Sequence, residues 1–270
     1  GVLCPHPRPC HPPAAMQAGA MTAIHFTAND SEIALAALGR LMDRYGQAPA
    51  SRADVIVALG GDGFMLSVLR QNLGRPVYGM NRGTVGFLMN DYAEDDLPAR
   101  ISGAEETVIN PLSMIAGTPD GDDYRALAIN EVSLLRAGPQ AARLRISVDG
   151  RVRMEELVSD GALLCTPAGS TAYNYSAGGP ILPLGSDVLA LTAIAPFRPR
   201  RWRGAILPKG AVVRFDVLDP RKRPVMADAD SRQVDSVLWV EIRSEPRIAH
   251  RILFDRGHGM DERLMREQFV

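Results

Sequence analysis

Hydrophobic positions near the start of the chain predict a strand followed by a helix. Residues 22–27, with Ile24 and Phe26, predict a short strand. From 35 to 45, apolar residues then recur every three or four positions, which is the period of one helix face. Polar residues at 29–31 offer an N-cap before this segment, and Gly46 suits its end.

The same alternation of strand and helix continues to residue 81. Residues 55–59 are continuously apolar and end in glycines, which is typical of a buried parallel strand. Residues 64–72 favour a short helix, and 76–81 favour another strand. Strands that alternate with helices predict an α/β layered domain for this part of the chain.

Around Asn110 the pattern changes to short runs that alternate between apolar and polar residues. Alternation with a period of two predicts half-buried strands. Asp149-Gly150 lies between two such runs and predicts a hairpin, because a type I′ turn needs positive φ at both positions. The second half therefore reads as an all-β, sandwich-like domain, whose alternating runs are 125–136, 143–158, 160–168, 187–196, 211–219 and 236–243.

Composition limits the class of protein. The 270 residues carry a formal net charge of -1, which offers nothing to attract bulk nucleic acid or an anionic membrane surface. No apolar run approaches the ~18 residues of a membrane span. Three cysteines without framework spacing favour a reducing compartment, so we expect a cytoplasmic protein.

The first twenty residues differ from the rest. They are rich in proline and lack the charged and apolar regions of a signal peptide. Cys4, His6, Cys10 and His11 suggest a metal cluster, but interleaved prolines make a poor tetrahedral cage. We expect residues 1–20 to be a disordered leader, and we expect no metal site built by the protein itself.

Two glycine-rich loops follow the predicted strands. Gly60, Gly61, Asp62 and Gly63 lie between a buried strand and a helix, where backbone N–H groups and the helix N-terminus favour phosphate. A carboxylate there repels phosphate, so it indicates chemistry; the alternative is a turn whose Asp caps the helix. The second loop, 79–87, fits GxxxGxxG, which is weak on its own.

Three further segments carry polar side chains suited to a ligand. Asn130-Glu131, expected inside an alternating strand, suggests an adenine or ribose contact; the alternative is one inward and one outward polar residue. Residues 159–180 combine small residues, hydroxyls and tyrosines, which suggests a loop that binds a base. The alternative is a glycine-rich crossover of the β domain. Four arginines around Trp202 form the densest positive patch and suggest phosphate binding or a subunit surface: Arg198, Arg200, Arg201 and Arg203.

Taken in order, these segments resemble the NAD kinase family over roughly 54–268. The family pattern is GGDG, N-x-G-x-x-G-F-L, N-E, D-G, TP-x-GSTAY and GGP. The chain matches it at Gly60–Gly63, Asn81–Leu88, Asn130-Glu131, Asp160-Gly161, Thr166–Tyr173 and Gly178–Pro180. Diacylglycerol and sphingosine kinases share GGDG alone.

The resemblance implies a role for each matching residue. Asp62 is implied as the catalytic base, with Gly60, Gly61 and Gly63 at the transferring phosphates. Asn130 and Glu131 are implied to hold the adenosine of NAD, and Asp160 the other end of the dinucleotide. Asp230 stands about where the family has an aspartate after a late strand. The implied pocket wall is Ala168, Thr171, Ala172, Tyr173, Asn174, Tyr175, Ser176 and Ala195.

The resemblance also implies the fold and the reaction. The expected fold is that of the NAD kinases and diacylglycerol kinases, with an α/β domain at 21–109, a β-rich NAD-binding domain at 110–252, and 253–270 returning to the first. The expected reaction makes NADP from NAD with ATP or polyphosphate and Mg²⁺, in a homo-oligomer (dimer or tetramer). The alternatives are a diacylglycerol-type lipid kinase and a non-catalytic NAD-sensing protein.

Overall fold

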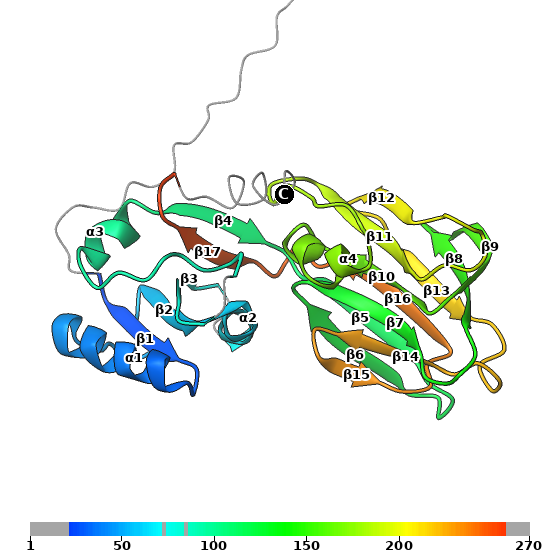
Figure 1. Cartoon of the computed structure of the whole chain (residues 1–270), viewed down its shortest axis with the longest axis horizontal. Coiled ribbons are helices and arrows are strands. Elements are labelled where there is room, and N and C mark those ends of the chain that lie inside the picture. Colours follow the sequence, from blue (N-terminus) through cyan, green and yellow to red (C-terminus); the bar gives the residue numbers. More distant parts are fainter. Residues whose placement is uncertain (1–21, 72–73, 84–85, 258–270) are drawn as a thin grey trace, which may run out of the picture.

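The chain folds into two parts that lie side by side (Figure 1). This computed structural model describes residues 22–71, 74–83 and 86–257. The expected leader at 1–20 and most of the returning segment at 253–270 lie outside the described residues. The first part contains a parallel sheet with helices, and the second contains two layers of antiparallel strands.

The first part is a five-stranded sheet in the order β1-β2-β3-β17-β4. Neighbouring strands run parallel except β4, which is antiparallel to β17. The strands are β1 (Ile24–Ala28), β2 (Val55–Gly60), β3 (Pro76–Asn81), β4 (Glu105–Ile109) and β17 (His250–Phe254). Helices α1 (Glu32–Tyr45) and α3 (Leu97–Ser102) pack on one face and α2 (Asp62–Gln71) on the other. Because both faces are covered, every position of β2 is buried, as its apolar run predicts.

The capping residues define α1 as expected. The Ser31 side chain accepts a hydrogen bond from the N–H of Ala34, which satisfies one of the free donors at the helix start. Gly46 ends the helix at a φ of 76°, and its N–H donates to the carbonyl of Met42. Both boundary signals in the sequence are confirmed.

The second part is a sandwich of two six-stranded antiparallel sheets, in the orders β12-β11-β10-β7-β14-β15 and β6-β5-β16-β13-β8-β9. Their inner faces share one large apolar core. Asp149 and Gly150 join β8 to β9 with φ angles of 51° and 73°, which confirms the predicted hairpin. The strands are β5 (Leu112–Gly117), β6 (Asp123–Ala128), β7 (Glu131–Arg136), β8 (Ala142–Val148), β9 (Arg151–Ser159), β10 (Gly161–Cys165), β11 (Val188–Ile194), β12 (Gly204–Pro208), β13 (Val213–Val217), β14 (Val225–Ala229), β15 (Arg232–Val234) and β16 (Trp239–Ser244).

One strand expectation is wrong. The alternating run 125–136 is two strands, because β6 ends at Ala128 and β7 begins at Glu131 in the other sheet. Asn130 therefore lies in the bend between the sheets and not inside a strand. Alternation continues across the switch, so the pattern alone does not reveal it.

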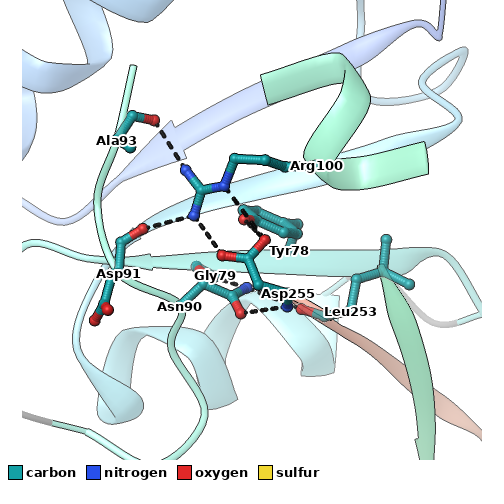
Figure 2. Close-up of polar contacts among 8 residues, drawn as sticks. All are labelled: Tyr78, Gly79, Asn90, Asp91, Ala93, Arg100, Leu253 and Asp255. Carbon is teal, nitrogen blue, oxygen red and sulfur yellow. Dashed lines mark hydrogen bonds and ion pairs between the residues drawn. The ribbon is translucent and has the colours of Figure 1, made fainter. Parts of the chain in front are cut away.

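Asn90 fixes the returning strand β17 in the first sheet (Figure 2). Its amide is fully buried and donates to the carbonyls of Gly79 and Leu253, each at 3.0 Å. Its oxygen accepts the N–H of Asp255 at 2.9 Å. Asn90 thus binds β3, the end of β17 and its own segment together.

Asp255 extends this cluster to α3. Its carboxylate pairs with Arg100 at 2.5 Å and accepts the hydroxyl of Tyr78 at 2.5 Å. Arg100 also donates to the carbonyls of Asp91 and Ala93 (Figure 2). Burial raises the pKa of Tyr78 far above its usual value, so its hydroxyl remains a donor to Asp255.

Candidate active site

Asp62 is the first residue of α2, directly after the buried strand β2. Its two carboxylate oxygens accept the backbone N–H groups of Phe87, at 2.7 Å, and Leu88, at 2.9 Å. Asp62 is half-buried, with its carboxylate fixed by the second glycine-rich loop.

The two glycine-rich loops lie against each other. The N–H of Arg82 donates to the carbonyl of Gly60 at 2.8 Å, and Gly83 lies beside the backbone of Gly61. A Cβ at Gly86 would overlap the Asp62 carboxylate, so this close approach requires glycine. The loops meet because they end the neighbouring parallel strands β2 and β3.

Asp230 holds the Asn130-Glu131 turn from one side. It lies in the tight turn between β14 and β15 with a φ of 48°, and it is only 8% exposed. Its carboxylate accepts the N–H groups of Ile129, Asn130 and Glu131 at 2.5–3.2 Å. Burial raises the pKa of Asp230, and these three donors together with the charge of Arg70 oppose that rise.

Thr166 holds the same turn from the other side. Its hydroxyl donates to the carbonyl of Ile129 at 2.7 Å, and its N–H donates to the carbonyl of Asn130 at 2.9 Å. A Cβ at Gly169 would overlap the carbonyl of Asn130. The TP-x-G part of the sequence motif therefore shapes the turn through close contact.

The Asn130 and Glu131 side chains contain buried polar atoms without partners. Asn130 Oδ1 and Glu131 Oε2 have no hydrogen-bond partner in the described part of the chain. Burial, with Asp230 and Asp228 nearby, raises the pKa of Glu131 to about 8. Buried polar atoms are normally satisfied, so this pair indicates a place where a ligand supplies the missing bonds.

The loop after β10 covers the outer face of its sheet. It forms two short helices, η1 (Ala168–Thr171) and α4 (Tyr173–Ser176). The sequence pattern had also allowed a plain glycine-rich crossover at this place. Burial raises the pKa of Tyr173, and the negative charges of Glu131 and then Asp160 add to that rise. Among the expected pocket residues of this loop, Thr171, Ala172 and Tyr173 are half-buried, while Tyr175 and Ser176 are exposed.

Two expected pocket residues have internal contacts. Asn174 is fully buried; its amide donates to the carbonyls of Ser170 and Pro180, and its oxygen accepts the hydroxyl of Thr192. Ala168 is buried in the apolar cluster between the two parts of the molecule. Both residues hold the loop in place, and their contact with a ligand stays a prediction.

Asp160 lies at the opposite end of β10 from Glu131. Since Glu131 pairs with Cys165, the backbone positions of Asp160 and Glu131 are separated by five residues of strand, roughly 17 Å. Asp160 pairs with Arg136 at 2.6 Å, and its N–H donates to the carbonyl of Ile194, next to the exposed Ala195. A ligand that contacts both ends of β10 must span about this length.

The arginine patch follows Ala195 on the loop between β11 and β12. All four arginines are exposed, and Trp202 packs partly against the sandwich core. The backbone at Phe197 and Arg198 bonds to Val158 of β9, so the patch begins beside Asp160. Either phosphate binding or a subunit surface fits this exposure.

One apolar cluster joins the first glycine-rich loop to the Asn130-Glu131 turn. Met65 and Leu66 of α2 pack with Ile129, Ala168 and Phe87. Figure 1 shows α2 on the side of the first part that faces the sandwich. Packing therefore brings Asp62 and Asn130 into one region, although 68 residues of sequence separate them.

Sequence reasoning missed the residues that support the site. Thr166 was only part of a motif, and Arg70, whose guanidinium donates to the carbonyl of Asp230 at 3.1 Å, gave no signal. Arg82, whose guanidinium stacks on Tyr92 at 3.6 Å, was only an unspecified position of the second glycine-rich loop. A lone arginine inside a helix pattern looks like an ordinary surface residue.

Within the described residues, no helix is both long and apolar enough to cross a membrane. In the same ranges, no group of three or more His, Cys, Asp and Glu side chains is placed to hold a metal ion.

Known proteins of similar sequence are NAD kinases. Family models match the ATP-NAD kinase N-terminal domain at residues 15–100 and the ATP-NAD kinase C-terminal domain at residues 129–243. An NAD kinase of Cereibacter sphaeroides is 69% identical over 249 residues, which cover 92% of this chain and 98% of that protein. An NAD kinase of Brucella suis is 55% identical over 249 residues, with 92% and 97% covered.

Solved structures share the fold. Yeast NADH kinase complexed with NADH superimposes with a TM-score of 0.80 at 20% identity, covering 96% of this chain and 92% of that one. An NAD kinase from Archaeoglobus fulgidus in complex with ATP gives 0.71 at 23% identity, covering 90% and 98%. These matches confirm the expected fold class, an α/β domain followed by a β sandwich. Together with the family models and the relatives, they show that this chain belongs to the NAD kinase family.

Proposed function

We propose that the protein transfers the terminal phosphoryl group of ATP to the 2′-hydroxyl of the adenosine ribose of NAD, giving NADP and ADP. The observation that carries this proposal is the pair of unpartnered atoms on Asn130 and Glu131, in the same region as Asp62. The family assignment supports the same reaction. No observation favours the lipid-kinase or NAD-sensing alternatives.

The acceptor would bind along the outer face of the sandwich. Asn130 Oδ1 would accept a hydrogen bond from the adenosine, and Glu131 would bond its hydroxyls. Near neutral pH the raised pKa of Glu131 keeps much of its carboxyl protonated, so it can donate as well as accept. Tyr173 would border the base, while Asp160 and Ala195 would meet the nicotinamide end of the dinucleotide.

The donor would bind at the first glycine-rich loop. Gly60, Gly61 and Gly63 would present backbone N–H groups to the phosphates, and the N-terminus of α2 would add partial positive charge. Within the described residues no cluster of metal ligands surrounds this loop, so Mg²⁺ would arrive bound to the nucleotide phosphates. When bound, that ion would offset the charge of the transferring phosphates.

Asp62 would act as the general base. It would take the proton of the 2′-hydroxyl as this oxygen forms its bond to the terminal phosphorus and the bond to the leaving ADP oxygen breaks. Phe87 and Leu88 orient the carboxylate through their N–H groups. A fixed carboxylate loses little orientational freedom when the reaction begins.

The product of the purified protein tests this proposal. We expect NAD, ATP and Mg²⁺ to give NADP that a 2′-phosphate-specific dehydrogenase reduces. Parallel reactions with NADH as acceptor and polyphosphate as donor define the substrates. Phosphate at another position, or no phosphorylated dinucleotide from any pairing, would contradict the proposal.

A further inference from the structure

Helix α2 contacts the sandwich through its last turn. Arg70 bonds back along the helix to the carbonyl of Leu66 at 3.1 Å, and its Nη1 donates to the carbonyl of Asp230 at 3.1 Å. The first bond holds the side chain against its own helix. Arg70 therefore joins the first part of the molecule to the tight turn between β14 and β15.

Asp230 links this contact to the Asn130-Glu131 turn. The residue that accepts Arg70 with its backbone carbonyl also accepts the N–H groups of Ile129, Asn130 and Glu131 with its side chain. Arg70 also counters the negative charge of the buried Asp230 carboxylate. A shift of Asp230 would therefore move the turn that carries Asn130 and Glu131.

The other end of α2 carries Asp62. Eight residues of helix separate Asp62 from Arg70, about 12 Å along the axis. Leu69 of α2 packs in the same apolar cluster as Ile252 of β17, which fixes the end of α2 to the first sheet. The helix is thus held at both ends.

We propose that Arg70 is a positioning residue that acts through Asp230 to hold the Asn130-Glu131 turn in the conformation that binds NAD. This inference rests on the proposed function, because it concerns the turn assigned to the NAD acceptor. Arg70 itself touches neither substrate. Its loss lets the turn move, so it weakens NAD binding first.

Arg70→Met tests the proposal, because it keeps the length of the side chain and removes the hydrogen bonds. We expect the Kd for NAD, measured by calorimetry, to rise ~10-fold, while kcat at saturating NAD stays within about threefold of wild type. Arg75→Met is the matched control. Arg75 also donates to backbone carbonyls, those of Ala53 and Ser51, but both lie within the first part. This control should leave Kd and kcat unchanged.

A double-mutant cycle distinguishes positioning through Asp230 from general loosening. If Arg70 acts through Asp230, Arg70→Met should add little to the Kd of Asp230→Asn. Additive effects, or a wild-type Kd in Arg70→Met, would overturn the proposal. If Arg70→Met does not fold, Arg70→Lys, which keeps the charge, should show a smaller rise in Kd, and an unchanged Kd would overturn it too. Wild-type protein that binds NAD without making NADP would refute the proposed function, and the Kd values would still decide this inference.

Discussion

At the scale of single residues, the site depends on polar groups that the fold buries without partners. Asn130 has a buried oxygen that bonds nothing in the described part of the chain, although Asp230 and Thr166 satisfy the backbone around it. Such an arrangement costs stability in the free protein. The cost is reasonable where a ligand completes the bonds.

Replacing Asn130 with Ala removes that acceptor and keeps the backbone of the turn. We expect KM for NAD to rise by the equivalent of ~1–3 kcal/mol, with a smaller change in kcat, because one hydrogen bond to the bound dinucleotide is lost. Steady-state kinetics at saturating ATP measure both constants. An unchanged KM would mean that Asn130 only shapes the bend.

Glu131 makes stability depend on pH. Its pKa is about 8 in the folded protein and near 4.5 in the unfolded chain, so the folded state binds more protons between these values. The free energy of unfolding therefore falls as pH rises from 4.5 to 8, and the contribution is neutral below 4.5.

Glu131→Gln removes this titration while keeping the shape. We expect its Tm to exceed that of wild type by more at pH 8.5 than at pH 5, in thermal melts without ligand. Glu105→Gln, at an exposed position of β4, is the control and should show no such trend. A Tm difference that is the same at both pH values would argue against a buried, protonated Glu131.

At the scale of elements, local patterns predicted the first part well. Caps and apolar spacing defined α1, and continuous burial defined β2. The short helix α3 and the turns η1 and α4 gave no such pattern, because they are too short for a periodic signal. The break at Asn130 was missed because Asp230 replaces the hydrogen bonds of a strand ladder there, and a partner 100 residues away leaves no local trace.

The contacts of Asp255 lead to a separate prediction about the stability of β17. Arg100 and Asp255 are each less than one-fifth exposed, and Asp255→Asn leaves the Arg100 charge without its partner. We expect a loss of ~2–4 kcal/mol in the free energy of unfolding, measured with urea. Arg251→Met, which breaks the exposed pair between Arg251 of β17 and Glu106 of β4, should cost under ~1 kcal/mol. Equal losses in the two variants would show that the cluster does not stabilise the returning strand.

At the scale of the whole molecule, the site depends on contacts between distant segments. The motifs identified the residues, and the resemblance supplied their roles. Neither indicated that Asp62 is bonded to the second glycine-rich loop, or that α2 reaches Asp230 through Arg70. These contacts depend on how β2, β3 and the sandwich pack, which no local pattern encodes.

The most direct test of the central claim compares binding with turnover in Asp62→Asn. The substitution keeps the shape and removes the base, although its amide can satisfy only one of the two N–H groups that Asp62 accepts. The NAD contacts at Asn130 and Glu131 remain. We predict that this variant binds NAD with a Kd close to that of wild type by calorimetry, yet forms NADP at least ~100-fold more slowly. Near-normal turnover would contradict the assignment of Asp62 as the base and leave it only the role of holding the Phe87-Leu88 segment.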